Sequence, residues 1–172
     1  FKYALDNKAD YIFQMDADFS HDPKHLPQFL NDMDNADVVI GSRWVDKGGV
    51  EDCGITRKLI STGGSLYSRK ILNLPIRDVT GGFKCFKATV LRAIDFSKIR
   101  SRGFSFQIEM NYIVHLLGFK IRETPIYFVN RKLGQSKMSF TIFISAFINV
   151  WIIKYLHRKN ILGQTSASAS KI

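Results

Sequence analysis

Short apolar runs alternate with longer stretches of helical spacing along most of this chain, and this alternation limits the fold more than any other feature. Strands are expected at residues 11–15, 38–40, 83–86 and 120–128, and helices at 1–7, 23–33, 56–72, 87–94 and 104–117. Such alternation is typical of an α/β fold, in which helices cover the faces of a sheet. The 172 residues, of which 45% are hydrophobic, suffice for one domain with its own core.

Two single residues and the start of the chain refine this outline. Gly118 suits the C-terminal cap of the helix before it. Pro125 interrupts the last strand, so we expect an edge position or a bend there. Residues 1–7 resemble the second half of a helix with no strand before it, and the chain is therefore expected to be N-terminally incomplete.

Positive charge is concentrated in the C-terminal part of the chain. Residues 1–97 carry 13 Lys/Arg and 13 Asp/Glu, whereas residues 98–172 carry 12 and 2, which accounts for the whole net charge of +10. This asymmetry indicates an anionic partner, which is a nucleic acid, a phosphate-bearing substrate or an acidic membrane surface. A solvated basic face that aids solubility is the alternative.

Cysteine and histidine give no sign of a metal centre. Cys53 and Cys85 are far apart and form no CxxC motif, so neither a zinc site nor a disulfide framework is expected, and a reducing compartment is the default. The four histidines are scattered and are expected to be structural or surface residues.

Two carboxylates, Asp16 and Asp18, directly follow the first expected strand. Residues two apart on a strand face the same way, and neighbouring carboxylates repel unless a positive charge lies between them. Hard divalent cations take such oxygen ligands and keep places for substrate phosphates. The pair therefore predicts a cation that carries a diphosphate, although Asp18 could instead cap a turn built with Ser20, Asp22 and Pro23.

Basic and polar residues that could meet this cation occur further along the chain. Arg43 follows the second strand and could grip a phosphate beyond the carboxyl end of the sheet. Arg57 and Ser61 are spaced i, i+4 and share a helix face that could hold a second anion, although exposed residues of these types are also ordinary. Arg131 and Lys137 belong to a cationic loop that could close over a phosphate substrate or simply be solvated.

Glycines and two polar residues suggest a ligand pocket. Gly81 and Gly82 allow the backbone to approach a ligand closely, and a tight turn explains them equally well. Gln107 and Glu109 lie in an apolar stretch, where they could contact hydroxyl groups or be satisfied by the backbone.

The chain contains one long apolar run, at residues 140–153. Its 14 residues fall short of the ~20 that cross a bilayer. Lys and Arg flank the run, and Trp151 and Tyr155 lie near its end, which suits a helix in a lipid headgroup layer. A buried core helix is the alternative. The Ser- and Ala-rich residues 160–172 are expected to be disordered.

Six motifs together resemble the dolichol- and polyprenol-phosphate mannosyltransferases across roughly residues 10–140. They are MDADFSHDPKHLPQF at 15–29, GSR at 41–43, RKLIS at 57–61, DVTGGFKCF at 78–86, GFSFQIEM at 103–110 and RKLGQSKMS at 131–139. The resemblance implies a partial GT-A catalytic domain over 1–139, with a mixed α/β sheet, and an interfacial helix over 140–159. The family begins with a strand and loop that cradle the guanosine; those residues are absent here, so this chain alone is expected to be weakly active or inactive.

The same resemblance implies inverting transfer of mannose from GDP-mannose to the phosphate of a membrane polyprenol or dolichol, a step in glycosylation. Asp16, Asp18 and Ser20 would hold Mg²⁺ or Mn²⁺, with Ser20 acting through water, and Ala17 would lie against the substrate. Asp16, Asp18 and Arg131 would be catalytic. The remaining implied substrate-binding residues are Arg43, Arg131 and Lys137 for donor phosphates, Arg57 and Ser61 for the lipid phosphate, and Gly81, Gly82, Gln107 and Glu109 for the sugar.

The implied location is peripheral or monotopic, on the cytoplasmic face of a bacterial or archaeal plasma membrane or of the endoplasmic reticulum, with a membrane-anchoring subunit left open. Transfer from another nucleotide sugar such as UDP-glucose is the nearest alternative. A haloacid-dehalogenase-type phosphatase fits less well because Glu109 and Glu123 are the only acidic residues after residue 95. A nucleic-acid-binding module is supported only by the net charge, and no nucleic-acid partner is expected.

Overall fold

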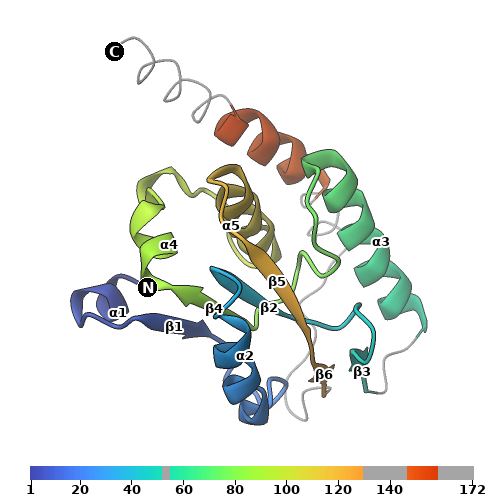
Figure 1. Ribbon diagram of the computed structural model, residues 1–172. Coiled ribbons are helices and arrows are strands. Elements are labelled where there is room, and N and C mark those ends of the chain that lie inside the picture. The colour runs from blue at the N-terminus through green and yellow to red at the C-terminus, as the bar shows by residue number, and fades with distance from the viewer. Residues whose placement is uncertain (52–54, 130–146, 159–172) are drawn as a thin grey trace.

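A computed structural model describes residues 1–51, 55–129 and 147–158, with the backbone alone described at 55–58. Figure 1 shows a central sheet with helices on both faces. The elements are α1 (Lys2–Asp6), β1 (Tyr11–Gln14), η1 (Pro23–His25), α2 (Leu26–Asp32), β2 (Val38–Ser42), β3 (Gly49–Val50), α3 (Ile55–Leu72), β4 (Lys84–Lys87), α4 (Ala88–Ala93), η2 (Phe96–Lys98), α5 (Phe104–Leu116), β5 (Ile121–Pro125) and β6 (Tyr127–Phe128). Residues 147–158 form one further helix, called here the C-terminal helix.

The main sheet is mixed, as predicted, with strand order β1-β4-β2-β5. Strand β4 runs antiparallel to both neighbours, while β2 and β5 are parallel. Strands β1 and β2 therefore point the same way on either side of β4, and their carboxyl ends share one edge of the sheet with the start of β4. Pro125 ends β5 at the border of the sheet, which confirms the predicted edge position.

Side chains that alternate along the strands build a separate core on each face of the sheet. One core gathers Ile12, Ile40 and Phe86 under α3, α4 and α5, and the other packs Val39 and Cys85 against α2. In Figure 1, α2 lies across the opposite face of the sheet from α5. The helix predicted at 104–117 ends as expected, because Gly118 adopts a φ of +79° just after it.

The C-terminal helix has one buried side, as expected for a core helix, and one exposed side. Val150 and Ile153 are buried in the core beneath it, whereas Trp151 and Tyr155 are 55% and 68% exposed on its outer side. It contacts α3, where Trp151 Nε1 donates to the Tyr67 hydroxyl at 3.0 Å, and α5, where His157 Nε2 lies 2.6 Å from Glu109 Oε1. Among the helices that the structure describes, none has the length and hydropathy needed to cross a bilayer. The expected interfacial residues 140–146 and the expected tail at 160–172 lie outside the described residues.

One charged residue lies inside the core. Lys84 is fully buried at the start of β4, and its Nζ donates to Gln107 Oε1 at 2.8 Å and to the Gln107 carbonyl at 3.3 Å. Burial lowers the pKa of Lys84 to about 7, although the negative charge of Asp78 opposes this effect. A buried ammonium group without a directly bonded carboxylate is costly.

We therefore expect Lys84→Met to raise the free energy of unfolding by about 1–4 kcal/mol below about pH 7, where Lys84 is protonated in both the folded and the unfolded state. Between about pH 7 and 10.5 only the unfolded chain keeps the proton, so the stability of the parent protein rises with pH and the advantage of Lys84→Met shrinks. Urea unfolding across this pH range measures the difference. Lys70→Met, at an exposed position on α3, is the matched control and should change stability little.

A lower stability of Lys84→Met at every pH would contradict this prediction. It would mean that the hydrogen bonds to Gln107 outweigh the cost of burying the ammonium group.

Candidate active site

At the shared edge of the sheet, the loop after β1, the end of β2 and the first turn of α5 meet the residues before β4. Gly82, just before β4, lies beside the loop after β1 and the first turn of α5. A Cβ atom at Gly82 would lie 3.9 Å from Asp16 Oδ1, and 3.7 Å from both His21 Cε1 and Gln107 Nε2. The strand order explains the meeting, because Gln14 in β1 pairs with Lys84 in β4, so that the residue before β4 lies beside the residue after β1. The glycine keeps a small space open among polar side chains.

The acidic pair lies on a structured loop after β1. The Asp16 side chain is exposed, whereas Asp18 Oδ1 accepts hydrogen bonds from the backbone N–H and the hydroxyl of Ser20. Phe19, between Asp18 and Ser20, adopts a φ of +64° and is 90% exposed. Ser20 itself is buried and therefore holds Asp18 in place from behind.

His21 fixes the same loop from inside the protein. Its Nδ1 accepts the Asp16 backbone N–H at 2.9 Å, so this nitrogen carries no proton. The ring stacks on Phe83, with 4.9 Å between ring centroids. Burial lowers the pKa of His21, and this effect outweighs the carboxylates of Asp16 and Asp18, which raise it. A neutral His21 thus supports the acidic loop, in agreement with the expectation that the histidines are structural or surface residues.

Arg43 lies at this edge as predicted, but an acidic partner holds it. Its Nε and Nη2 donate to the two carboxylate oxygens of Asp78, each at 2.7 Å, and Nη2 also donates to Thr80 Oγ1 at 3.1 Å. The carboxylate of Glu123 in turn accepts the backbone N–H groups of Arg77 and Asp78. The charge of Arg43 also lowers the pKa of His21, so Arg43 and the acidic loop belong to one electrostatic site.

Gln107 and Glu109 separate, because residues two apart on a helix face different directions. Gln107 reaches Gly82, with which it was grouped in the predicted sugar pocket. Glu109 does not: it is buried, accepts N–H groups from Arg100 and Ser101, and lies 2.6 Å from His157 Nε2. Burial raises the pKa of Glu109, but these hydrogen bonds outweigh it and hold the pKa below its usual value. The expectation that Glu109 lines the sugar pocket is therefore corrected to a structural role.

Several predicted residues lie away from this centre or outside the description. Arg131 and Lys137 fall outside the described residues. Arg57 belongs to the first turns of α3, where the backbone alone is described, and Ser61 is partly exposed one turn later. Within the described ranges, no group of three or more His, Cys, Asp and Glu side chains is arranged to hold a metal ion.

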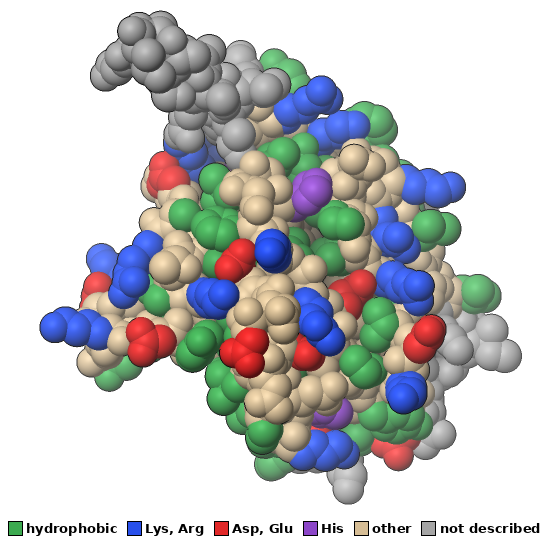
Figure 2. All heavy atoms as spheres, viewed as in Figure 1, with side chains coloured by type: hydrophobic (Ala, Val, Ile, Leu, Met, Phe, Trp, Pro, Cys, Tyr) green, Lys and Arg blue, Asp and Glu red, His purple; other side chains and the backbone are tan. Residues whose placement is uncertain are grey.

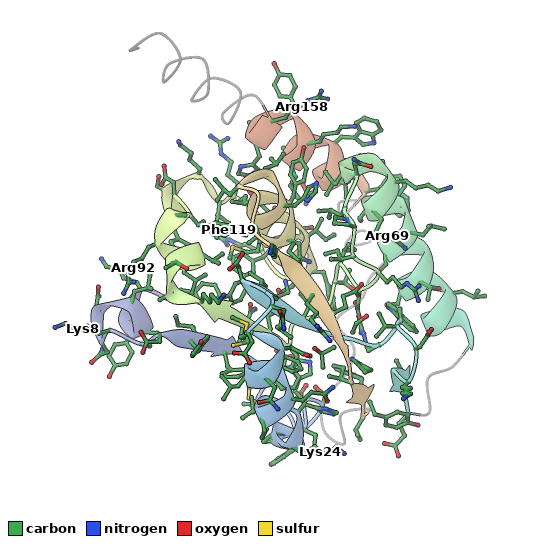
Figure 3. All side chains as sticks on the ribbon, in the orientation of Figure 1. Lys8, Lys24, Arg69, Arg92, Phe119 and Arg158 are labelled. Carbon is green, nitrogen blue, oxygen red and sulfur yellow. The ribbon has the colours of Figure 1, made fainter. Side chains whose placement is uncertain are left out.

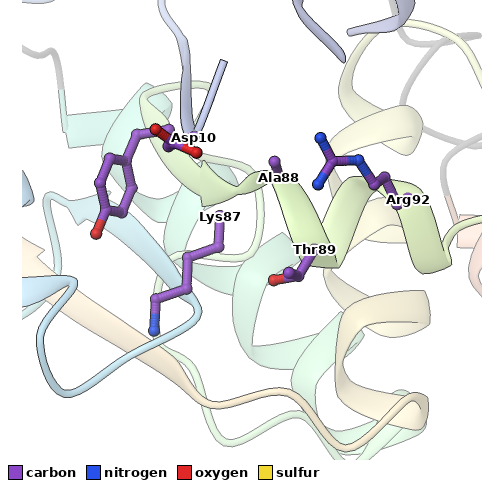
Figure 4. Close-up of a pocket in the computed structure, with 6 residues that line it drawn as sticks. Asp10, Lys87, Ala88, Thr89 and Arg92 are labelled. Atoms are coloured by element: carbon purple, nitrogen blue, oxygen red, sulfur yellow. The ribbon is translucent and has the colours of Figure 1, made fainter. Parts of the chain in front are cut away.

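The protein also has an open hollow of about 340 Å³ at the other end of β1 and β4 (Figure 4). It is lined by Asp10, Tyr11, Lys87, Ala88, Thr89 and Arg92. Tyr11 pairs with Lys87 at the opposite end of the two strands from Gln14 and Lys84, so this hollow is separate from the acidic loop.

Comparison with known proteins agrees with the resemblance carried by the six motifs. The family model for glycosyl transferase family 2 matches residues 3–95. The undecaprenyl-phosphate mannosyltransferase of Micrococcus luteus is 45% identical over 150 residues, covering 87% of this chain and 62% of that relative. The polyprenol monophosphomannose synthase of Mycolicibacterium smegmatis is 39% identical over 140 residues, covering 81% of this chain and 53% of that relative.

The predicted resemblance to polyprenol-phosphate mannosyltransferases is therefore confirmed, although the chain spans only about half to two thirds of the length of these relatives. The match to the family model covers more than half of the chain and includes the acidic loop, Arg43 and Gly82. On this evidence the chain belongs to glycosyl transferase family 2.

Proposed function

We propose that the full-length protein transfers mannose from GDP-mannose to the phosphate of a membrane polyprenol, with inversion at the sugar carbon. The observation that carries this proposal is the meeting of Asp16, Gln107 and the side-chain-free Gly82 at one edge of the sheet. The names of the two relatives supply the class of sugar and acceptor. A mixed sheet flanked by helices and the family membership fit a GT-A-like fold.

The residues of the acidic loop suit a divalent cation. Asp16 and Asp18 offer carboxylate oxygens on one loop, and Mg²⁺ and Mn²⁺ commonly bind through one or two carboxylates together with substrate phosphates. The Ser20 hydroxyl donates a hydrogen bond to Asp18 and so orients a carboxylate that would bind the ion, in keeping with an indirect role of Ser20 in metal binding. When bound, the ion would neutralise the charge of the departing diphosphate.

The acceptor explains why the site needs no strongly basic residue. A phosphate monoester is already largely anionic at neutral pH, so its oxygen can attack the sugar carbon directly. The carbon–oxygen bond to the diphosphate of GDP breaks as the bond to the lipid phosphate forms. Among the residues the structure describes at the site, His21 is neutral and its Nδ1 already accepts the Asp16 backbone N–H. This fits a mechanism based on positioning and charge.

Phosphate binding is proposed for cations on both sides of the transferred sugar. Arg43, held by Asp78, would present a fixed positive charge near the donor, together with Arg131 and Lys137. Arg57 and Ser61 on α3 would receive the lipid phosphate. This assignment requires α3 to face the membrane.

An exposed apolar stripe on α3 and the C-terminal helix supports that orientation. Figure 2 shows hydrophobic side chains interspersed with Lys and Arg on this side of the molecule, and Figure 3 shows Arg158 extending from the C-terminal helix away from the sheet. The stripe consists of Leu66, Ile148, Trp151, Ile152 and Tyr155. Apolar residues bordered by cations suit the surface of an anionic membrane, so we propose peripheral attachment there, on the cytoplasmic face.

Asp16→Asn should lower mannosyl transfer by the full-length protein by about 100-fold or more, because one carboxylate ligand of the ion is lost. Chelation of divalent ions should abolish transfer, and adding Mg²⁺ or Mn²⁺ should restore it. Transfer of radiolabelled mannose from GDP-mannose to a polyprenol phosphate measures both effects. Asp22→Asn, in the same loop, is the control and should leave transfer nearly unchanged.

A panel of sugar nucleotides separates the proposed donor from its nearest alternative. Transfer from UDP-glucose in place of GDP-mannose would keep the chemistry and change the sugar. Absence of any metal-dependent product from every donor would rule out the proposed function.

Ile148→Ser combined with Tyr155→Ser should weaken binding to vesicles by about tenfold or more, since both side chains lose apolar area that the lipid would bury. Cosedimentation with vesicles of phosphatidylglycerol and phosphatidylcholine measures the binding. Tyr3→Ser combined with Leu30→Ser removes exposed apolar side chains from α1 and α2 and is the matched control. Equal loss in both double variants would contradict the proposed membrane face.

A further inference from the structure

The buried Lys84 stands directly behind the candidate site, and stability alone does not explain it. It is the first residue of β4, it is fully buried, and its hydrogen bonds run to Gln107 in the first turn of α5. An apolar side chain of similar length would avoid the cost of burying an ammonium group. A buried ammonium group that is costly for stability and lies next to the candidate site points to a contribution to the chemistry of that site.

The contact with Lys84 decides which way the Gln107 amide points. A side-chain amide has an accepting oxygen and a donating nitrogen, and its two orientations are otherwise hard to tell apart. The protonated ammonium form of Lys84 can only donate, so it requires the amide oxygen, and Gln107 Oε1 lies 2.8 Å from its Nζ. The nitrogen must then face the other way, where Gln107 Nε2 approaches Gly82.

The space at Gly82 is consequently bordered by a donating amide nitrogen, Gln107 Nε2, beside the Asp16 carboxylate. Donors suit an oxygen acceptor, either a sugar hydroxyl or a diphosphate oxygen of the nucleotide sugar. The ammonium group polarises the amide through its oxygen and makes the nitrogen a stronger donor, as in other chains of hydrogen bonds.

We infer that Lys84 is a positioning residue for sugar transfer: it holds Gln107 Oε1 so that Gln107 Nε2 donates to an oxygen of the nucleotide sugar above Gly82. This inference rests on the proposed function and adds a residue to it. Lys84 acts through Gln107 and does not itself touch the substrate.

Gln107→Glu tests the direction of the amide, because it replaces the donating nitrogen by an oxygen and changes the shape little. The new carboxylate can still accept a hydrogen bond from Lys84, so folding should be preserved. It presents an acceptor to the nucleotide sugar beside Asp16, so the full-length enzyme with Mg²⁺ should bind GDP-mannose about tenfold to one-hundredfold more weakly by calorimetry. Unchanged binding of GDP-mannose would overturn the inference.

Binding of GDP alone identifies the oxygen that Gln107 holds. If Gln107→Glu weakens GDP-mannose but not GDP, the donor holds a sugar hydroxyl. If it weakens both to the same extent, the donor holds a diphosphate oxygen. Either result supports the role of Gln107 Nε2.

A double-mutant cycle tests whether Lys84 acts through Gln107. Lys84→Met and Gln107→Ala should each lower kcat/KM for GDP-mannose about tenfold to one-hundredfold, and the double variant should lose no more than the more damaging single variant. Lys87→Met, on the same strand, is the matched control and should retain transfer. Thermal unfolding of each variant checks that the loss of activity is not a loss of folded protein.

Multiplication of the two single effects in the double variant would overturn the inference, because Lys84 would then act independently of Gln107. Failure of the unsubstituted protein to transfer any sugar would instead count against the proposed function. The two failures are therefore distinguishable.

Discussion

The antiparallel insertion of β4 between β1 and β2 is the constraint on which the site depends. Because β1 and β2 run in one direction and β4 in the other, the ends of two strands and the beginning of a third meet at one edge of the sheet. Gly82 is thereby placed beside Asp16, and Gly81 beside Gly41, whose carbonyl oxygen would lie 3.1 Å from a Cβ atom at Gly81. In a wholly parallel sheet the two glycines would lie at the far end of their strand.

Polar contacts then hold each segment of the site in position. The bidentate pair of Arg43 and Asp78 joins the end of β2 to the loop before β4, and its geometry is of the strong, directional kind. Glu123 on β5 fixes the backbone of the same loop. His21 fixes the backbone of Asp16. The acidic loop and the loop before β4 are thus each held by side chains from other parts of the chain, as preorganised sites require.

Sequence reasoning succeeded where the signal is local. Periodicity located the four strands of the main sheet and the long helices, because a buried strand or a helix face repeats at a fixed spacing. Strand β3 was not predicted, since two residues are too few to show a period, whereas β6 lies at the end of the strand predicted at 120–128. Arg43 was expected beyond a strand end, on the same side as Asp16 and Asp18, and in the structure Arg43 and His21 of the acidic loop both contact the Phe128 ring. The position of Gly82 beside Asp16 was not predicted.

The supporting residues could not be predicted because their partners are distant in sequence. Asp78 and Arg43 are 35 residues apart, and Lys84 and Gln107 are 23 apart, so no local pattern links them. Lys84 looked like an ordinary basic residue in a short strand. Glu109 was misassigned because its polarity alone does not show which way it points, and residues two apart on a helix face different directions. Its actual partner, His157, lies 48 residues further on.

That partnership has a mechanical consequence. Glu109 and Gln107 lie within one turn of α5 but face different directions: Glu109 contacts His157 of the C-terminal helix, and Gln107 reaches Gly82. Helix α5 therefore links the C-terminal helix to the edge of the sheet where Asp16 and Gly82 meet. A displacement of the C-terminal helix would be passed to Gln107 through one buried acid–imidazole contact.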